Sequence, residues 1–154
     1  YYSYLNDLPI TVFRFFTVYG PWGRPDMALF KFTKNIISGN PIDIYNHGKM
    51  KRDFTYIDDI IAGVRSSIDK NFNCEIFNLG NNKSEDLLNM ISIIEKKLKM
   101  KARINFLPIQ PGDVKVTCAD IEKSKNLLNF SPKIKLDKGL NLFIDWYLRY
   151  YEKN

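Results

Sequence analysis

Few residues in this sequence are of the types that carry out nucleophilic, acid–base or metal chemistry. His47 is the only histidine, and the two cysteines, Cys74 and Cys118, lie far apart in apolar, strand-like stretches. A zinc site needs several such ligands and a serine–histidine–acid triad needs a histidine, so either site would depend on His47. We expect neither site, and we expect both cysteines to be buried free thiols rather than a disulfide.

The adjacent carboxylates Asp58 and Asp59 suggest acid–base catalysis on spacing alone. They follow Thr55 in the stretch TYID, which matches the capping box that begins a helix. A capping role explains Asp58 without any chemistry. We therefore predict a helix that begins near Tyr56 rather than a catalytic pair.

A loop rich in glycine and proline separates two apolar runs in residues 14–30, RFFTVYGPWGRPDMALF. Neither G-x-G-x-x-G nor G-x-x-x-x-G-K-[ST] occurs anywhere in the sequence. A doubly wound nucleotide-binding domain carries a glycine-rich turn of this kind after its first strand. The chain therefore either binds no dinucleotide or forms the latter part of something longer.

Hydrophobic periodicity predicts strands that alternate with helices. Short β-branched or aromatic runs predict strands at residues 10–16, 42–45, 75–79 and 103–107. Apolar residues at helical spacing predict helices over residues 27–38, from Tyr56, from a cap at Ser84, and after caps at Asp120 and Asp137. This alternation is typical of α/β architecture.

The composition indicates a folded domain with a basic surface. The chain has 154 residues, 45% of them hydrophobic, and a formal net charge of +6. Its densest basic patches, residues 96–101 and 133–135, lack the interleaved aromatic residues of a nucleic-acid surface, so we expect no nucleic-acid partner. No stretch has the length and apolar character of a membrane span or a signal peptide, which predicts a soluble, cytoplasmic protein without a membrane partner.

Five segments, in order along the chain, resemble the NAD-dependent nucleotide-sugar epimerase/dehydratase family of extended short-chain dehydrogenases. They are residues 14–21 (RFFTVYGP), 23–28 (GRPDMA), 52–59 (RDFTYIDD), 77–80 (FNLG) and 110–113 (QPGD). The loop at 23–28 and the segments around 52–59 and 110–113 are most similar to UDP-glucuronate 4-epimerases. The resemblance covers essentially the whole chain.

The resemblance implies an α/β fold class in two regions. The last elements of a Rossmann-like doubly wound sheet would lie at 1–20 and 53–80, and a smaller UDP-sugar-binding region at 21–52 and 81–154. The family's glycine-rich NAD fingerprint and its catalytic Tyr-x-x-x-Lys would lie upstream of Tyr1. We therefore expect no catalytic residue and no epimerase activity in this chain alone, and apolar surface that its own strands leave uncovered.

In the family reaction NAD accepts a hydride from C4 of the sugar, while the upstream tyrosine removes the O4 proton. The 4-keto sugar then turns over and takes the hydride back on its other face. A sugar that turns cannot be held tightly, so the UDP group must supply the binding energy. The resemblance implies that Thr17, Arg24, Lys31, Tyr45, Arg52 and Asp113 bind the substrate and that Phe15 and Thr17 contact the cofactor.

Individual roles follow from the resemblance. Arg52 would bind the diphosphate through its planar fork, Tyr45 would stack on uracil, and Asp113 would accept from the ribose hydroxyls. Lys31 would supply a second positive charge, because Gln110 stands where several relatives carry an arginine. On spacing alone, three alternative roles remain open: a salt-bridged Arg52, a core Tyr45 and a turn formed by Gly112 and Asp113.

Arg24 is the residue that would discriminate between sugars. A uronic acid carries a carboxylate on C5, so oxidation at C4 creates a β-keto acid that loses CO₂ readily. We hypothesise that Arg24 and Thr17 clamp this carboxylate in a geometry that resists decarboxylation. The alternative is a loop arginine exposed to solvent.

The sequence thus predicts the C-terminal, substrate-binding portion of an NAD-dependent UDP-sugar 4-epimerase that interconverts UDP-glucuronate and UDP-galacturonate. The alternatives are a UDP-glucuronate decarboxylase, a nucleotide-sugar 4,6-dehydratase, or a non-catalytic nucleotide-sugar-binding module. The resemblance also implies a homodimer for the full-length protein and a role in surface-polysaccharide biosynthesis.

Overall fold

Paired strands organise the chain, which the computed structural model describes over residues 1–151. The strands are β1 (Ile10–Phe15), β2 (Thr17–Tyr19), β3 (Pro41–Ile44), β4 (Lys51–Tyr56), β5 (Cys74–Leu79), β6 (Ser84–Asp86) and β7 (Arg103–Phe106). The helices are α1 (Tyr2–Asn6), α2 (Ala28–Ile37), α3 (Ile57–Arg65), α4 (Leu87–Leu98), α5 (Glu122–Leu128) and α6 (Leu136–Tyr151), with a 3₁₀ turn η1 (Tyr45–Gly48). Strands and helices alternate, so the α/β prediction is confirmed.

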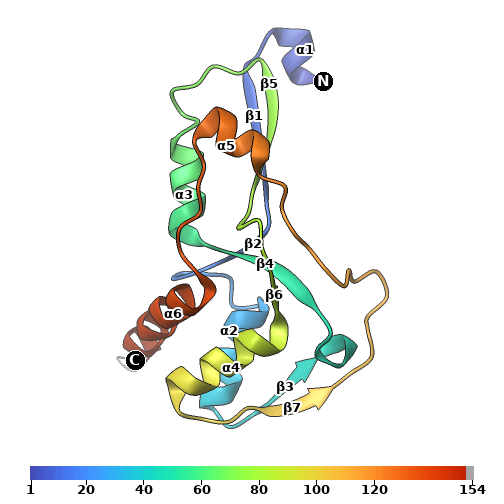
Figure 1. Ribbon diagram of the computed structural model, residues 1–154, viewed down its shortest axis with the longest axis vertical. Helices are drawn as coiled ribbons and strands as arrows, with labels where there is room; N and C mark the ends of the chain where they lie inside the picture. The colour runs from blue at the N-terminus through green and yellow to red at the C-terminus, as the bar shows by residue number, and fades with distance from the viewer. Residues whose placement is uncertain (152–154) are drawn as a thin grey trace.

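The upper part of the molecule in Figure 1 is built on the parallel pair β1–β5, whose register runs from Ile10 opposite Cys74 to Phe15 opposite Leu79. Helices α3 and α5 lie beside this pair. Their shared core consists of Ile60, Phe77, Leu79, Ala119, Ile121, Leu128 and Phe130. The segment from Ala119 to Phe130 thus packs on the β1–β5 layer, although it follows β7 in sequence.

The β1–β5 pair carries apolar residues that residues 1–151 leave partly exposed. Val12, Phe15 and Ile76 are 41%, 52% and 41% exposed. Phe13 and Phe15 stack with their ring centroids 6.0 Å apart, as expected for alternate residues on one face of a strand. The predicted uncovered apolar surface is confirmed.

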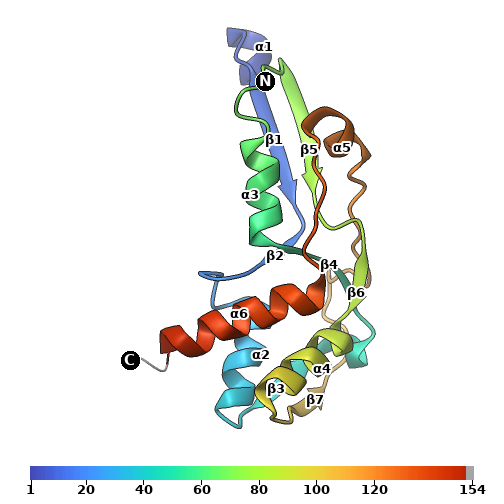
Figure 2. The same cartoon turned by 60° about the vertical axis from the view of Figure 1, so that its left-hand side comes forward.

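The lower part of the molecule contains α2, α4 and α6 with the parallel pair β3–β7 (Figure 2). Its larger core includes Phe30, Ile36, Ile44, Met90 and Phe143. Helix α6 approaches the end of β2 closely at Gly139, where a Cβ atom would lie only 2.1 Å from the Tyr19 hydroxyl. Only glycine permits this approach, which fixes α6 against the strand.

A three-stranded sheet, β2–β4–β6, joins the two parts (Figure 1). β2 and β4 are parallel, whereas β4 and β6 are antiparallel. β4 contributes Phe54 to the lower core, and its continuation, α3, contributes Ile60 to the upper core. The predicted first strand, residues 10–16, therefore ends at Phe15, and Thr17 belongs to a second strand in another sheet.

The predicted capping box at Thr55 is wrong. Thr55 lies within β4 opposite Val18, and its hydroxyl donates to the Asp53 carboxylate at 3.1 Å. Pairing with β2 keeps the chain extended through Tyr56, so α3 begins one residue later without a side-chain cap. Asp58, the expected capping partner, is exposed.

Two other residues expected to cap helices, Ser84 and Asp137, do not do so. Ser84 lies in β6, paired with Asp53, and its hydroxyl donates to the Thr117 carbonyl at 2.6 Å, so α4 begins only at Leu87. Asp137 lies inside the first turn of α6 rather than ahead of it. The Asp120 carboxylate does accept from the first amide of α5, at Glu122, with a distance of 3.0 Å.

Cys74 and Cys118 are free thiols, as predicted, but both are exposed rather than buried. Cys74 begins β5 at the open end of the strand pair, and Cys118 points away from the core that its neighbour Ala119 enters. None of the helices in residues 1–151 has the length and apolar character to cross a membrane.

Candidate functional site

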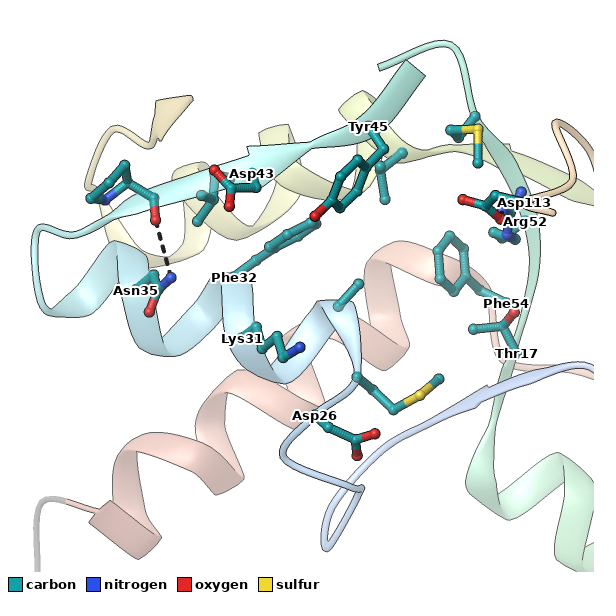
Figure 3. A pocket seen from close by; sticks show the side chains of 16 residues that line it. Thr17, Asp26, Lys31, Phe32, Asn35, Asp43, Tyr45, Arg52, Phe54 and Asp113 are labelled. Atoms are coloured by element: carbon teal, nitrogen blue, oxygen red, sulfur yellow. Dashed lines mark hydrogen bonds and ion pairs between the residues drawn. The ribbon is translucent and has the colours of Figure 1, made fainter. Parts of the chain in front are cut away.

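A cavity of about 400 Å³ opens where β2 and β4 face α2 and β3 (Figure 3). Five of the predicted substrate-binding residues line it, and they come from separate elements or loops: Thr17, Lys31, Tyr45, Arg52 and Asp113. Met27, Phe32, Met50, Phe54 and Leu87 supply apolar walls. An apolar cavity with a few converging polar groups has the general form of a small-molecule site.

Arg52 and Asp113 form an ion pair at one end of this cavity, with Nη2 and Oδ1 2.7 Å apart. The Arg52 side chain is 19% exposed, and its Nη1 also donates to the carbonyls of Lys51 and Lys115 at 3.0 and 3.4 Å. Asp113 belongs to the long segment between β7 and α5, so this pair ties that segment to β4. The guanidinium fork is thus held at the cavity wall, where it could meet an anion.

Lys31 and Tyr45 line the cavity from other walls. Lys31 projects from α2, and Tyr45 begins η1, directly after β3 (Figure 3). Lys31 makes no ion pair within residues 1–151, so its charge is available to a ligand. The cavity therefore offers two cations and an aromatic ring to one bound molecule.

Arg24 lines a smaller neighbouring cavity of about 50 Å³ that also contains Thr17, Met27 and Phe54. Thr17 belongs to both cavities, so the two are contiguous. The Arg24 guanidinium is exposed and donates through Nε to Asp26 at 3.0 Å. This hydrogen bond holds the pKa of the Asp26 carboxyl below its usual range. Arg24 is thus close to Thr17 but paired within its own loop.

Phe15 lies outside both cavities. It ends β1, its ring is exposed, and it stacks on Phe13. The cofactor role expected for Phe15 therefore has no support from a cavity in residues 1–151. Gln110 is also exposed and does not line the main cavity.

Three polar wall residues, Asp26, Asn35 and Asp43, have no counterpart among the predicted site residues. The Asn35 amide donates to the Pro41 carbonyl at 3.1 Å, which leaves its own carbonyl oxygen as an acceptor. Asp43 accepts from Asn105 on the neighbouring strand at 3.2 Å. Asp43 lies in β3, where alternation with the buried Ile42 and Ile44 turns it outward, a pattern that could have identified it.

Asp53 has a structural role that the sequence did not predict. Its side chain is fully buried, and its carboxylate accepts from the backbone amides of Asn81 and Ala119 at 2.6 and 2.9 Å and from the Thr55 hydroxyl. It thus joins β4 to the turn after β5 and to the segment before α5. Because Asp53 follows Arg52 on one strand, this network fixes the position of the arginine.

Burial disfavours ionisation of two tyrosines near the site, Tyr19 and Tyr56. Burial raises the pKa of Tyr19 far above its ordinary value, with further contributions from neighbours that include Tyr56 and Asp59. Burial also raises the pKa of Tyr56, and Asp58 adds to the shift. Both phenols therefore stay protonated and act in packing; their rings meet edge to face with centroids 5.6 Å apart.

One Tyr-x-x-x-Lys spacing occurs in the chain, from Tyr45 to Lys49. It falls in η1, where Asn46 and His47 both have φ near +50°, so the spacing does not lie on a regular helix. Tyr45 lines the cavity, whereas Lys49 is exposed. Across residues 1–151, no group of three or more His, Cys, Asp or Glu side chains is arranged to hold a metal ion.

The sequence model of the NAD dependent epimerase/dehydratase family matches residues 1–80. The chain belongs to this family. The match covers the β1–β5 pair, the loop with Arg24, and the strand with Arg52 and Asp53. Residues 81–154, which include Asp113, lie beyond the matched region.

Relatives of this epimerase/dehydratase chain match almost all of it but extend well beyond it. Protein MJ1055 of Methanocaldococcus jannaschii is 51% identical over 96% of this chain and 45% of its own. UDP-glucuronate 4-epimerase 1 of Arabidopsis thaliana is 44% identical over 99% of this chain and 40% of its own. The chain thus spans about half the length, or less, of the curated relatives it matches.

A solved structure shares the fold in detail. UDP-glucuronic acid 4-epimerase from Bacillus cereus, in complex with UDP-glucuronic acid and NAD, superposes with a TM-score of 0.92 at 39% identity. The match covers 97% of this chain and 48% of that one. The mixed α/β arrangement is therefore that of part of an extended epimerase fold.

Replacing Asp53 by asparagine should destabilise the protein. An amide cannot accept at every position where the carboxylate now meets a donor, so a buried N–H loses its partner, which costs about 1–3 kcal/mol. Urea-induced unfolding measures this loss, with Asp58→Asn, an exposed carboxylate on the same segment, as the matched control. Equal stability of the two variants would contradict the clamping role of Asp53.

Proposed function

We propose that this chain is the C-terminal, substrate-binding portion of an NAD-dependent UDP-sugar 4-epimerase that interconverts UDP-glucuronate and UDP-galacturonate. The observation that carries the proposal is the convergence of Thr17, Lys31, Tyr45, Arg52 and Asp113 on one cavity. These residues are spread over nearly a hundred positions of sequence and share no local motif. The Arabidopsis and Bacillus relatives, which are named for this activity, support the same substrate class.

The cavity suits a nucleoside diphosphate. Arg52 can bind a phosphate with both nitrogens of its fork, and Lys31 can bind the other as a point charge. The Tyr45 ring offers a face on which uracil stacks. Asp113, once its arginine turns to the phosphate, can accept from the ribose hydroxyls. Membership of the epimerase/dehydratase family supports this assignment of the cavity residues to the parts of UDP.

The residues present fit one part of an NAD site. Thr17 follows the carboxyl end of β1, where α/β sheets bind their ligands, and the exposed Phe15 ends that strand. When bound, NAD would supply the hydride acceptor and donor for C4 of the sugar. This chain's part is to place the sugar at that edge of the sheet, with Thr17 next to the reacting ring.

Arg24 would hold the uronic acid carboxylate together with Thr17. Both line the small cavity next to the main one, and its volume of about 50 Å³ suits a group of carboxylate size. The guanidinium now bonds to Asp26, an exposed pair that contributes little to stability. A buried substrate carboxylate can therefore replace Asp26 as the partner of Arg24.

Other properties belong to the same proposal. Residues 1–20 and 53–80 would complete a Rossmann-like domain, and residues 21–52 and 81–154 would form the sugar-binding region, with Ala119 to Phe130 packed on the first. The whole protein would act as a homodimer in the cytoplasm, without a nucleic-acid partner. A role in surface-polysaccharide synthesis follows from the sugar nucleotides it would use.

The first test is activity with UDP-glucuronate. A protein of the relatives' length that ends in this chain should form UDP-galacturonate, and residues 1–154 alone should form none, because their only Tyr-x-x-x-Lys lies in η1. Chromatography of the sugar nucleotides with mass detection distinguishes the products. A UDP-pentose or a 4-keto-6-deoxy sugar as the main product would indicate a decarboxylase or a dehydratase instead, and turnover by residues 1–154 would contradict the proposal.

Removal of the Arg52 side chain should weaken UDP binding. Loss of charge-assisted hydrogen bonds to a phosphate costs about 1.5–3 kcal/mol, or roughly 10- to 100-fold in Kd. Calorimetric titration with UDP compares Arg52→Ala with Arg103→Ala, an exposed arginine on β7 outside the cavity. Equal affinities of the two variants would rule out the diphosphate role.

Removal of the Arg24 side chain should change the products. Without the clamp, the keto acid can turn its carboxylate into the geometry that loses CO₂, so the decarboxylated fraction should rise about tenfold or more. The ratio of UDP-pentose to UDP-galacturonate measures this partition in the complete enzyme. Arg52→Ala is the control, because it should lower affinity without changing the ratio. An unchanged ratio in Arg24→Ala would refute the clamp.

A further inference from the structure

The loop between β2 and α2, residues 20–27, is anchored at its start but holds Arg24 by contacts within itself. Gly20 packs against α3, where a Cβ would lie 2.4 Å from Ile57 Cγ2. Beyond Gly20, backbone hydrogen bonds run from the Gly23 amide to the Gly20 carbonyl and from the Met27 amide to the Arg24 carbonyl, at 3.3 and 3.2 Å. Arg24 itself bonds to Asp26. These contacts shape the loop without fixing the arginine relative to the cavities.

Trp22 links the middle of this loop to helix α6. Its indole lies 5.3 Å from the Trp146 ring and 4.9 Å from the Tyr150 ring, centroid to centroid. Both partners belong to α6, where they stack on each other with an interplanar angle of 18°. The tilted and edge-on orientations of Trp22 are those that aromatic pairs prefer.

Two features show that this placement of Trp22 needs a specific cause. The side chain is 72% exposed, so burial alone does not hold it. Its backbone has φ of +61°, a left-handed conformation that bulky residues rarely adopt. A bulky residue in this conformation persists where surrounding contacts determine it. The rings of α6 supply such contacts.

Helix α6 is a fixed reference for the loop. Its residues Leu140, Phe143, Ile144 and Tyr147 lie in the large core, and its Gly139 abuts Tyr19 at the end of β2. Trp146 packs in turn against Phe143, with ring centroids 5.7 Å apart. A residue joined to Trp146 is thereby joined to the strand that carries Thr17.

We propose that Trp22 is a positioning residue for the reaction: its contact with Trp146 and Tyr150 keeps Arg24 beside the cavity that it shares with Thr17. The inference rests on the carboxylate role proposed above for Arg24. Trp22 lines neither cavity, so it acts through the arginine and not on the sugar. Loss of the indole should free the loop while the UDP end of the site, built on Arg52 and Tyr45, stays intact.

The test uses Trp22→Ala in the complete enzyme, with Trp22→Phe as the conservative variant. Leu142→Ala, a half-exposed site on α6 outside the aromatic cluster, is the matched control. In Trp22→Ala the ratio of decarboxylated to epimerised product should rise roughly tenfold, because a small misplacement of a clamping group is costly. KM for UDP-glucuronate should stay within about threefold, since the distant UDP end contributes independently. Trp22→Phe should restore most of the wild-type ratio.

Two structural readouts follow the loop without reference to the reaction. Hydrogen exchange at the amides of residues 22–27 should accelerate in Trp22→Ala and not in Leu142→Ala. The chain contains two tryptophans, Trp22 and Trp146, so exciton coupling between them should contribute a circular-dichroism couplet that Trp22→Phe removes. Unchanged exchange in Trp22→Ala would overturn the proposal.

The outcomes separate this inference from the one on which it rests. A shifted product ratio in Arg24→Ala, with an unchanged ratio in Trp22→Ala despite faster loop exchange, would overturn the positioning role alone. An unchanged ratio in Arg24→Ala would overturn the carboxylate clamp and, with it, the functional consequence proposed for Trp22. A changed ratio in Leu142→Ala equal to that in Trp22→Ala would reduce Trp22 to a general contribution to stability.

Discussion

The buried carboxylate of Asp53 is the interaction on which the arrangement of this chain depends. A charge without access to water is tolerated only where donors surround it, and here two backbone amides and a hydroxyl do so. The amides come from the turn after β5 and from the segment before α5, so the carboxylate holds three parts of the chain at one point. Gly80 permits this, because a Cβ there would lie 2.3 Å from Ala119 and 3.2 Å from Asp53.

Strand β4 places one residue, Asp53, in the protein interior and its neighbour, Arg52, at the site. Along β4, Asp53 points into the protein and Arg52 points to the cavity, as alternation requires. The segment with Asp113 and Lys115 runs beside β4, with the Lys51 amide bonded to the Lys115 carbonyl at 2.9 Å and the Thr117 amide to the Lys51 carbonyl at 3.2 Å. Fixing Ala119 at Asp53 therefore also restrains Asp113 opposite Arg52.

Local patterns predicted elements well where periodicity alone decides the structure. The helix expected over residues 27–38 is α2, whose apolar stripe packs in the large core, and the strands at 75–79 and 103–107 agree with β5 and β7 to within one residue. The expected caps at Thr55 and Ser84 failed for a common reason. Both residues pair with β-strands distant in sequence, and a local motif contains no information about such pairing.

The residues of the site also differ in how far the sequence predicted them. Motif order identified Arg52, Tyr45 and Asp113 as a group, and the fold brings them to one cavity. Asp53, by contrast, lies inside a recognised motif, but its role depends on amides 28 and 66 positions away. The role proposed for Trp22 likewise depends on contacts with α6, more than a hundred residues downstream. Residues that position other residues through contacts distant in sequence are therefore the hardest to identify from the sequence.

The charges around the main cavity show how a site can be ordered before its ligand arrives. Arg52 and Asp113 neutralise each other, as do Arg24 and Asp26, while Lys31 has no ion-pair partner in the described part of the chain. The Arg24–Asp26 pair is exposed and contributes little free energy, so replacing Asp26 by a substrate carboxylate costs little. The Arg52 guanidinium is held at the cavity wall by Asp113, so it is oriented before a phosphate binds. The carboxylates thus act as internal stand-ins for the anions of the proposed substrate. In this arrangement the cost of ordering the long Arg52 side chain falls on folding rather than on binding.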